Sequence, residues 1–422
     1  MKIVLNKQPR SRLMRTLRPV LFWTHLVAGV ISGVVVLIMS VTGVLLTYQK
    51  QMTLWADLRG IEAGPPAPGA VRLTPDSLLA LVAARESKTP SNVVWRNGAD
   101  MPVEVQFGRE GRQYLSAYTG EVLGTGSVGM RKVFSVATDW HRWLAMKDDG
   151  RSTGKAVTGW SNMAFLVLVL TGMVLWWPRN LTARAVQQVL WFRRGLSAKA
   201  RDFNWHNVIG IWSALPLVAV VASATVISFP WASDLVYRVV GEEPPARATA
   251  TANSGSAATG SREAGSRRAG SQSGDAPREE ARDIPVVGDV YTMAAARMPD
   301  WRTLSLAWPK AADAPLVYSL DRGMGGEPHK RATLTISRTG DAPKWSAFGD
   351  QSLGRRTRSI LRFTHTGEVL GVWGQTIAGL VSLGAVVLVY TGLALSLRRL
   401  LAWRRRSAAE PVVLDATPGA VA

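Results

Sequence analysis

The sequence predicts an α-helical integral membrane protein with four transmembrane helices in two parallel repeats, each repeat carrying a small α+β domain outside the membrane. Three observations predict this architecture. Four long stretches contain no Asp, Glu, Lys or Arg, the basic residues gather beside those stretches, and the two halves of the chain resemble each other. The 422 residues include no cysteine, which excludes disulfides, a lipoprotein anchor and the Cys-x-x-Cys-His attachment of c-type haem.

The four uncharged stretches cover residues 19–49, 156–178, 203–233 and 369–397. Each exceeds the roughly 20 apolar residues that cross a bilayer as a helix, and a helix satisfies its own backbone hydrogen bonds in lipid. The first stretch is about twice as long as the apolar region of a signal peptide, and no small-residue cleavage site follows it. We therefore expect all four to be retained as membrane spans.

Three short segments carry most of the +20 net charge: residues 1–18, 179–202 and 398–422. In a four-span layout they lie on one face of the membrane, which the positive-inside rule identifies as cytoplasmic. The charge is thereby explained as a topology signal, so we expect no nucleic-acid partner despite a pI near 10.9. The sequence predicts a bacterial inner-membrane protein in contact with lipid, with both termini cytoplasmic.

The two long connections, residues 50–155 and 234–368, are then expected in the periplasm. In the first, "TPDSLLALVAARES" at 74–87 has a helix-start signal, and "VEVQFG" and "RQYLSAY" alternate as strands. The second repeats the scheme, with "VYTMAAARM" as a helix and "LTISR" as a strand. We expect the end of the first connection to lie at the membrane interface. Residues 244–283 are rich in Ala, Ser, Gly and Arg, which predicts a disordered insert.

An internal duplication relates the two halves. Aligning "WTHLVAGVISG" from Trp23 with "NWHNVIGIWSA" from Asn204 places His25 on His206, and the same offset places Gly29 on Gly210 and Ser32 on Ser213. The second and fourth spans also match, through "LVLVLTGMVLWW" and "VVLVYTGLALSL". A Thr-Gly-acid turn precedes each of them, in "YTGEVLG" and "RTGDAPKW". The predicted unit is span, outer domain, span, used twice in parallel.

Four of the five histidines occupy paired places in this duplication. His25 and His206 lie near the cytoplasmic ends of the first and third spans, and His141 and His365 lie at the outer edge of the second and fourth. A single histidine there is as well explained by a place at the interface beside tryptophans. Histidine within a membrane is unfavourable without a partner, so pairs on both sides indicate a functional site.

Neutral imidazole binds iron, zinc and copper. A closed zinc site needs about four ligands, whereas two facing histidines on different helices suffice for a b-type haem. Small residues near the inner pair, Gly29, Ser32, Gly33, Gly210 and Ser213, fit either a haem slot or ordinary helix packing. Arginines on both sides fit either haem propionates or lipid headgroups: Arg15, Arg18 and Arg201 inside, and Arg142, Arg358 and Arg362 outside.

The set of motifs "THLVAGVISG", "YTGEVLG", "DWHRWL", "WHNVIGIW" and "FTHTGEVLG" resembles the PepSY-associated transmembrane family, and within it the inner-membrane ferric-siderophore reductases of the ferrioxamine type. The resemblance covers nearly the whole chain apart from the insert and the C-terminal tail. It implies two PepSY-like periplasmic domains and two haem b groups. It also implies that His25, His206, His141 and His365 are the axial ligands of the haem iron.

The expected function is therefore transmembrane electron transfer that reduces ferric siderophore iron in the periplasm and releases Fe(II). Hard oxygen ligands hold Fe(III) better than Fe(II), so one electron loosens the complex. No catalytic acid or base is needed. The sequence shows no nicotinamide- or flavin-binding motif, so the donor is expected to be quinol or a separate reductase.

Three alternatives remain open at this stage. The first is a haem-free module whose spans anchor PepSY-like domains that bind or regulate an exported peptidase. The second is a haem electron carrier serving another periplasmic acceptor. The third is a permease, which the absence of charged residues from all four spans disfavours.

Overall fold

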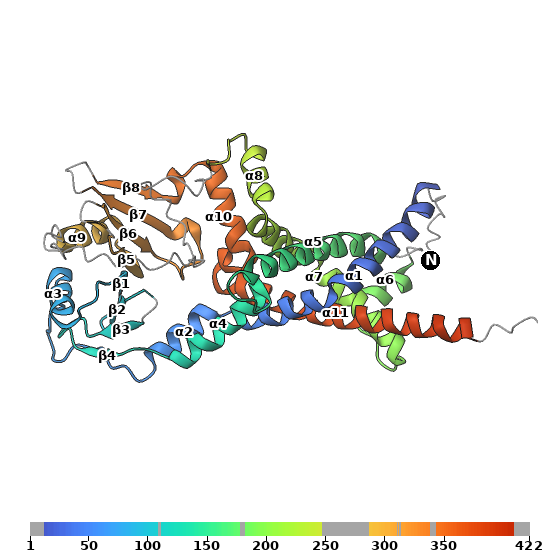
Figure 1. The fold of residues 1–422 in the computed structure, drawn as a ribbon, viewed down its shortest axis with the longest axis horizontal. Helices are drawn as coiled ribbons and strands as arrows, with labels where there is room; N and C mark the ends of the chain where they lie inside the picture. The colour runs from blue at the N-terminus through green and yellow to red at the C-terminus, as the bar shows by residue number, and fades with distance from the viewer. Residues whose placement is uncertain are drawn as a thin grey trace, which may run out of the picture. The chain divides into compact units, whose positions relative to one another are not determined.

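The computed structural model describes residues 12–108, 111–177, 182–246, 287–309, 311, 314–337 and 343–408. The chain divides into two compact units (Figure 1). The span unit contains the described residues up to Val44, those of Ala156–Ala222 and those from Gly379 onward. The sheet unit contains the described residues of Leu45–Lys155 and Ser223–Ala378.

Four long helices supply the span unit: α1 (Arg12–Leu46), α5 (Gly150–Trp176), α7 (Ala198–Ser228) and α11 (Gly371–Ala408). Within the described residues, these four are the helices long and apolar enough to cross a membrane. The four predicted spans are thus confirmed as apolar helices, but the third ends at Ser228 and not at residue 233, because Phe229 is extended and Pro230 begins another helix. α1 and α11 continue into the neighbouring basic segments because arginine and leucine are good helix formers. A short helix, α6 (Ala183–Leu190), lies between α5 and α7.

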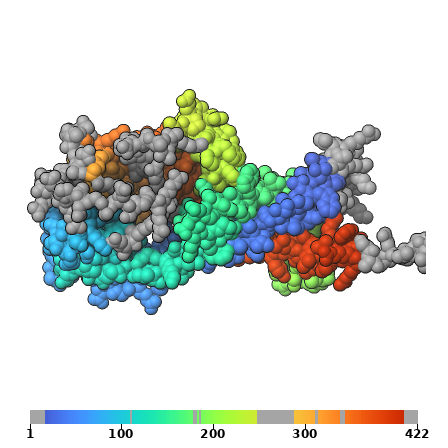
Figure 2. All heavy atoms as spheres, in the orientation of Figure 1, coloured from blue at the N-terminus to red at the C-terminus, as the bar shows by residue number. Residues whose placement is uncertain are grey.

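The span unit buries only a small apolar core. Val169, Leu217, Val221, Val381 and Ala385 form it. Large apolar side chains stay exposed along the helices, and the blue spheres of α1 lie at the surface in Figure 2. Apolar surface of this extent on long helices is what lipid tails cover.

The sheet unit contains one eight-stranded antiparallel sheet in the order β4-β3-β2-β1-β5-β6-β7-β8. The first connection supplies β1 (Asn92–Arg96), β2 (Val103–Gln106), β3 (Arg112–Leu115) and β4 (Val122–Gly124). The second supplies β5 (Thr303–Ala307), β6 (Leu316–Asp321), β7 (Arg331–Ile336) and β8 (Lys344–Ala347). β1 pairs with β5, with Val94 opposite Ser305. The strands of both connections therefore lie in a single sheet.

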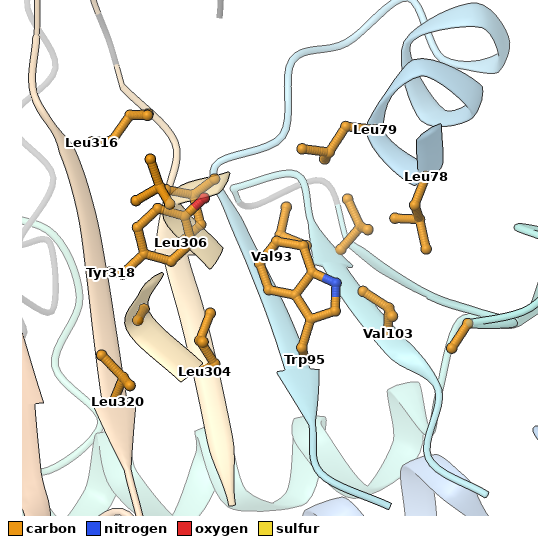
Figure 3. Close-up of a cluster of buried hydrophobic side chains, with 14 of the residues drawn as sticks. Leu78, Leu79, Val93, Trp95, Val103, Leu304, Leu306, Leu316, Tyr318 and Leu320 are labelled. Atoms are coloured by element: carbon orange, nitrogen blue, oxygen red, sulfur yellow. The ribbon is translucent and has the colours of Figure 1, made fainter. Parts of the chain in front are cut away.

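One face of this sheet is covered by α3 (Pro75–Arg85) and α9 (Val287–Arg297). Side chains alternate between the two faces of a strand, so Val93 and Trp95 of β1 and Leu304 and Leu306 of β5 point into one core (Figure 3). The predicted start of α3 is confirmed, because the Thr74 side chain accepts a hydrogen bond from the Ser77 amide at 3.2 Å.

Four further helices of the sheet unit follow or precede the long helices: α2 (Gln49–Leu58), α4 (Val128–Trp143), α8 (Pro230–Val239) and α10 (Leu353–His365). Short 3₁₀ turns cover Pro328–Lys330, Phe348–Asp350 and Glu368–Leu370. α2 packs on α4, and α10 packs on α8. The predicted insert at 244–283 lies outside the described residues from 247 onward, and so does the Thr-Gly turn at 339–340.

Val93 is fully buried in the central strand β1. The substitution Val93→Ala is expected to destabilise the sheet unit by about 2 kcal/mol, because it removes apolar burial and leaves a cavity. Val71→Ala is the matched control, since Val71 is 85% exposed. Thermal unfolding of the detergent-solubilised variants measures the difference. Equal midpoints for both variants would contradict the single-core arrangement.

Candidate functional site

The inner histidines lie together. His25 of α1 and His206 of α7 have ring centroids 6.3 Å apart, with the ring planes at 83°. Both rings are half-buried among apolar helices of the span unit. The structure therefore brings together the two residues that the sequence analysis paired across the first and third spans.

A threonine from a neighbouring helix contacts each inner histidine. His25 Nδ1 lies 2.9 Å from Thr171 Oγ1 of α5, and His206 Nδ1 lies 3.0 Å from Thr391 Oγ1 of α11. The two contacts are equivalent in atoms and distance. Each threonine belongs to a Thr-Gly step in the matching segments of the second and fourth spans.

The outer histidines also lie together. His141 is in the last turn of α4, and His365 is the last residue of α10, with ring centroids 6.1 Å apart and planes at 43°. Both belong to the sheet unit. The chain reverses sharply after α4 through Leu144, Ala145 and Asp148, which all have positive φ. Left-handed backbone is unfavourable for such residues, so this turn is held by its surroundings.

Close packing holds that turn. A Cβ built on Gly154 at the start of α5 would lie 2.2 Å from the Trp143 carbonyl oxygen, so only glycine allows this approach. The guanidinium groups of Arg142 and Arg151 lie 4.6 and 4.5 Å from the Trp143 ring centroid. This arrangement fixes the end of α4, which carries His141.

Arginines gather near the outer pair. Burial lowers the pKa of Arg142, and the neighbouring cations Arg362 and Arg151 lower it further. Mutual repulsion of this kind favours an anion as an additional partner. Of the other arginines considered from sequence, Arg358 donates to Ser233 and Arg201 to Asp202.

The spacing of both pairs fits a single metal ion between two imidazoles. Imidazole nitrogen binds a first-row metal at about 2.0 Å, and the ring centre lies about 1.1 Å behind the nitrogen, so two opposed ligands place ring centroids roughly 6 Å apart. The observed distances are 6.3 and 6.1 Å. Among the described residues, no group of three or more His, Cys, Asp or Glu side chains is placed to hold a metal. The donor sets therefore fit a two-ligand centre such as haem iron better than a four-ligand zinc site.

The small residues singled out in the spans contact their own or neighbouring helices. Ser32 and Ser213 donate to carbonyls one turn earlier in their own helices, at 2.8 and 2.6 Å. A Cβ on Gly33 would lie 3.0 Å from the Leu393 side chain. These contacts fit close helix packing.

A small polar cleft lies between α2 and the open face of β1, β2 and β3. Its volume is about 240 Å³, and its charged lining consists of Lys50, Asp57, Arg96, Glu104 and Arg112. Glu104 accepts from Arg96 at 2.6 Å and from Arg112 at 2.7 Å. Arg96 Nη1 is buried and has no hydrogen-bond partner in the described part of the chain. An unpaired buried donor beside excess positive charge favours an anionic ligand group.

The sequence analysis found all four histidines and missed Thr171 and Thr391. The signal was present, since the two Thr-Gly steps occur in matching segments. It was not recognised because the residue that each threonine contacts lies on another helix, more than a hundred positions away in the chain.

Glu104 is expected to make stability depend on pH. Burial alone raises the pKa of this carboxyl, but Arg96 and Arg112 outweigh burial and lower the pKa below its usual value. The stabilisation is present above the unfolded-state pKa and is lost as pH falls through the lowered folded-state pKa.

In Glu104→Gln, unfolding midpoints should therefore fall less steeply than in the wild type as pH drops below about 4.5. Thermal scans across the acid range measure the two slopes. Identical slopes would show that the ion pairs do not contribute.

A family model described as PepSY-associated TM region matches residues 22–399, a range that includes all four paired histidines. A search among curated proteins finds none that matches the chain. Because the family model covers most of the sequence, the chain belongs to the PepSY-associated transmembrane family.

Proposed function

We propose that this protein is a di-haem b transmembrane electron carrier that reduces the iron of a ferric siderophore in the periplasm and releases Fe(II). The carrying observation is that both histidine pairs have the ring spacing of two ligands on one metal ion, at 6.3 and 6.1 Å. Bound haem supplies reversible one-electron chemistry at the iron. His25 and His206 hold the inner haem, and His141 and His365 hold the outer one.

The proposed topology supports vectorial transfer. The two repeats run parallel, the basic segments and both termini are cytoplasmic by the positive-inside rule, and the sheet unit is periplasmic in the bacterial inner membrane. Either quinol or a separate reductase supplies the electrons, on the cytoplasmic side or within the membrane. Two ferric chelates accept the two electrons of one quinol, and each Fe(III) becomes Fe(II), which oxygen ligands hold less well.

Residues of the sheet unit have supporting roles. Arg142 and Arg362 lie close enough to repel each other, so a propionate there would relieve that repulsion. The α2 cleft of about 240 Å³ is smaller than the roughly 300–1,000 Å³ of a pocket for a whole small molecule. We assign it to one anionic arm of the acceptor.

The proposal predicts that proteoliposomes with reductant inside reduce a ferric chelate outside, and that a chromogenic Fe(II) chelator detects the product. His206→Ala and His365→Ala should each lose at least tenfold in rate, because each removes one ligand of a different haem. His329→Ala is the matched control, since His329 is exposed in a 3₁₀ turn.

The second candidate is a haem-free module whose PepSY-like domains bind or regulate an exported peptidase. The eight-stranded sheet is continuous and has a hydrophobic core of its own, which favours this second candidate. It predicts that all three histidine variants behave alike and that the purified protein has no haem absorbance.

A further inference from the structure

We infer that Thr171 and Thr391 are positioning residues that fix the tautomer of the inner histidines, so that His25 and His206 present Nε2 as the ligand atom. The functional consequence of this inference rests on the proposed haem site. The hydrogen bonds that carry it stand on the described residues alone.

The direction of each hydrogen bond follows from the single hydroxyl proton. Thr171 Oγ1 lies 2.7 Å from the Val167 carbonyl oxygen, which accepts and has no proton to give. The hydroxyl proton is therefore used within α5. The same oxygen lies 2.9 Å from His25 Nδ1, so it accepts a hydrogen bond there, and Nδ1 carries the proton.

The same argument applies to the contact between Thr391 and His206. Thr391 Oγ1 donates to the Val387 carbonyl at 2.7 Å and lies 3.0 Å from His206 Nδ1. A neutral imidazole has one protonated nitrogen. With the proton on Nδ1 in both rings, Nε2 keeps its lone pair and is the atom able to bind a metal.

The glycine after each threonine leaves room for the ring. A Cβ on Gly172 would lie 3.3 Å from His25 Cε1, and a Cβ on Gly392 would lie 3.5 Å from His206 Cε1. The next nearest ring atom is Nδ1 in both cases, at 3.9 Å, so a larger side chain at Gly172 would press on the ring edge that carries Nδ1. The Thr-Gly step thus provides an acceptor for Nδ1 and close packing along the same edge of the ring.

An acceptor on Nδ1–H makes the imidazole a more basic ligand. A more basic ligand stabilises Fe(III) relative to Fe(II), so removing the acceptor is expected to raise the midpoint potential of the inner haem. Loss of such an outer contact also typically weakens metal binding about 10- to 100-fold.

The test compares Thr171→Val and Thr391→Val, which keep the shape and remove the hydroxyl, with Thr171→Ser and Thr391→Ser, which restore it. Ser396→Ala is the control, because Ser396 also donates to a carbonyl of its own helix, that of Gly392 at 2.8 Å. Redox titration of the purified haem protein should show a raised inner potential and weaker haem retention in the valine variants, with the wild-type values in the serine variants and the control.

A second readout does not depend on haem. Side-chain ¹⁵N NMR of histidine-labelled, haem-free protein should show His25 and His206 as Nδ1–H tautomers, and the valine variants should shift toward Nε2–H. Nε2–H rings in the wild type, or unchanged potentials in the valine variants of a haem-loaded protein, would overturn the inference. Nδ1–H rings in a protein that never binds haem would overturn the proposed function and leave the tautomer assignment standing.

Discussion

The approach of His25 to His206 is the constraint on which the span unit depends. Polar rings within apolar helices are unfavourable unless each finds a partner. Here Thr171 and Thr391 contact one nitrogen of each ring, and the ring centroids lie 6.3 Å apart. The site therefore needs all four long helices, since α1 and α7 carry the histidines and α5 and α11 carry the threonines.

The sheet unit sets the outer pair by different means. His141 and His365 lie at the ends of two shorter helices, α4 and α10, whose directions are fixed by packing on α2 and α8. The turn after α4 is held by the close contact at Gly154 and by two arginines on Trp143. The ends of α4 and α10 thus bring the outer pair together, and threonine contacts accompany the inner pair.

Local signals in the sequence predicted the elements well. Runs without charge predicted the four long helices, and Thr74 with Pro75 predicted the start of α3, because both signals are contained within a few neighbouring residues. Pairing of His25 with His206 and of His141 with His365 followed from the internal duplication. The antiparallel pairing of β1 with β5 was not predicted, since Val94 and Ser305 are far apart in the chain and register depends on packing.

The threonine contacts escaped prediction for a related reason. A threonine in an apolar helix usually donates to its own backbone, and Thr171 and Thr391 do so. Their second contact depends on which helix lies alongside. For the glycines and serines near the inner pair, the sequence left a haem slot and helix packing open, and the contacts of Gly33 and Ser32 fit packing.

Haem content is the most direct test of the two histidine pairs. The purified protein from haem-replete cells would be assayed for haem b per chain, and the oxidised form examined by electron paramagnetic resonance. Two haems per chain, both low-spin with two imidazole ligands, are the expected result. A folded protein with no haem, or with haem bound in a form that lacks a second imidazole, would contradict ligation by these pairs.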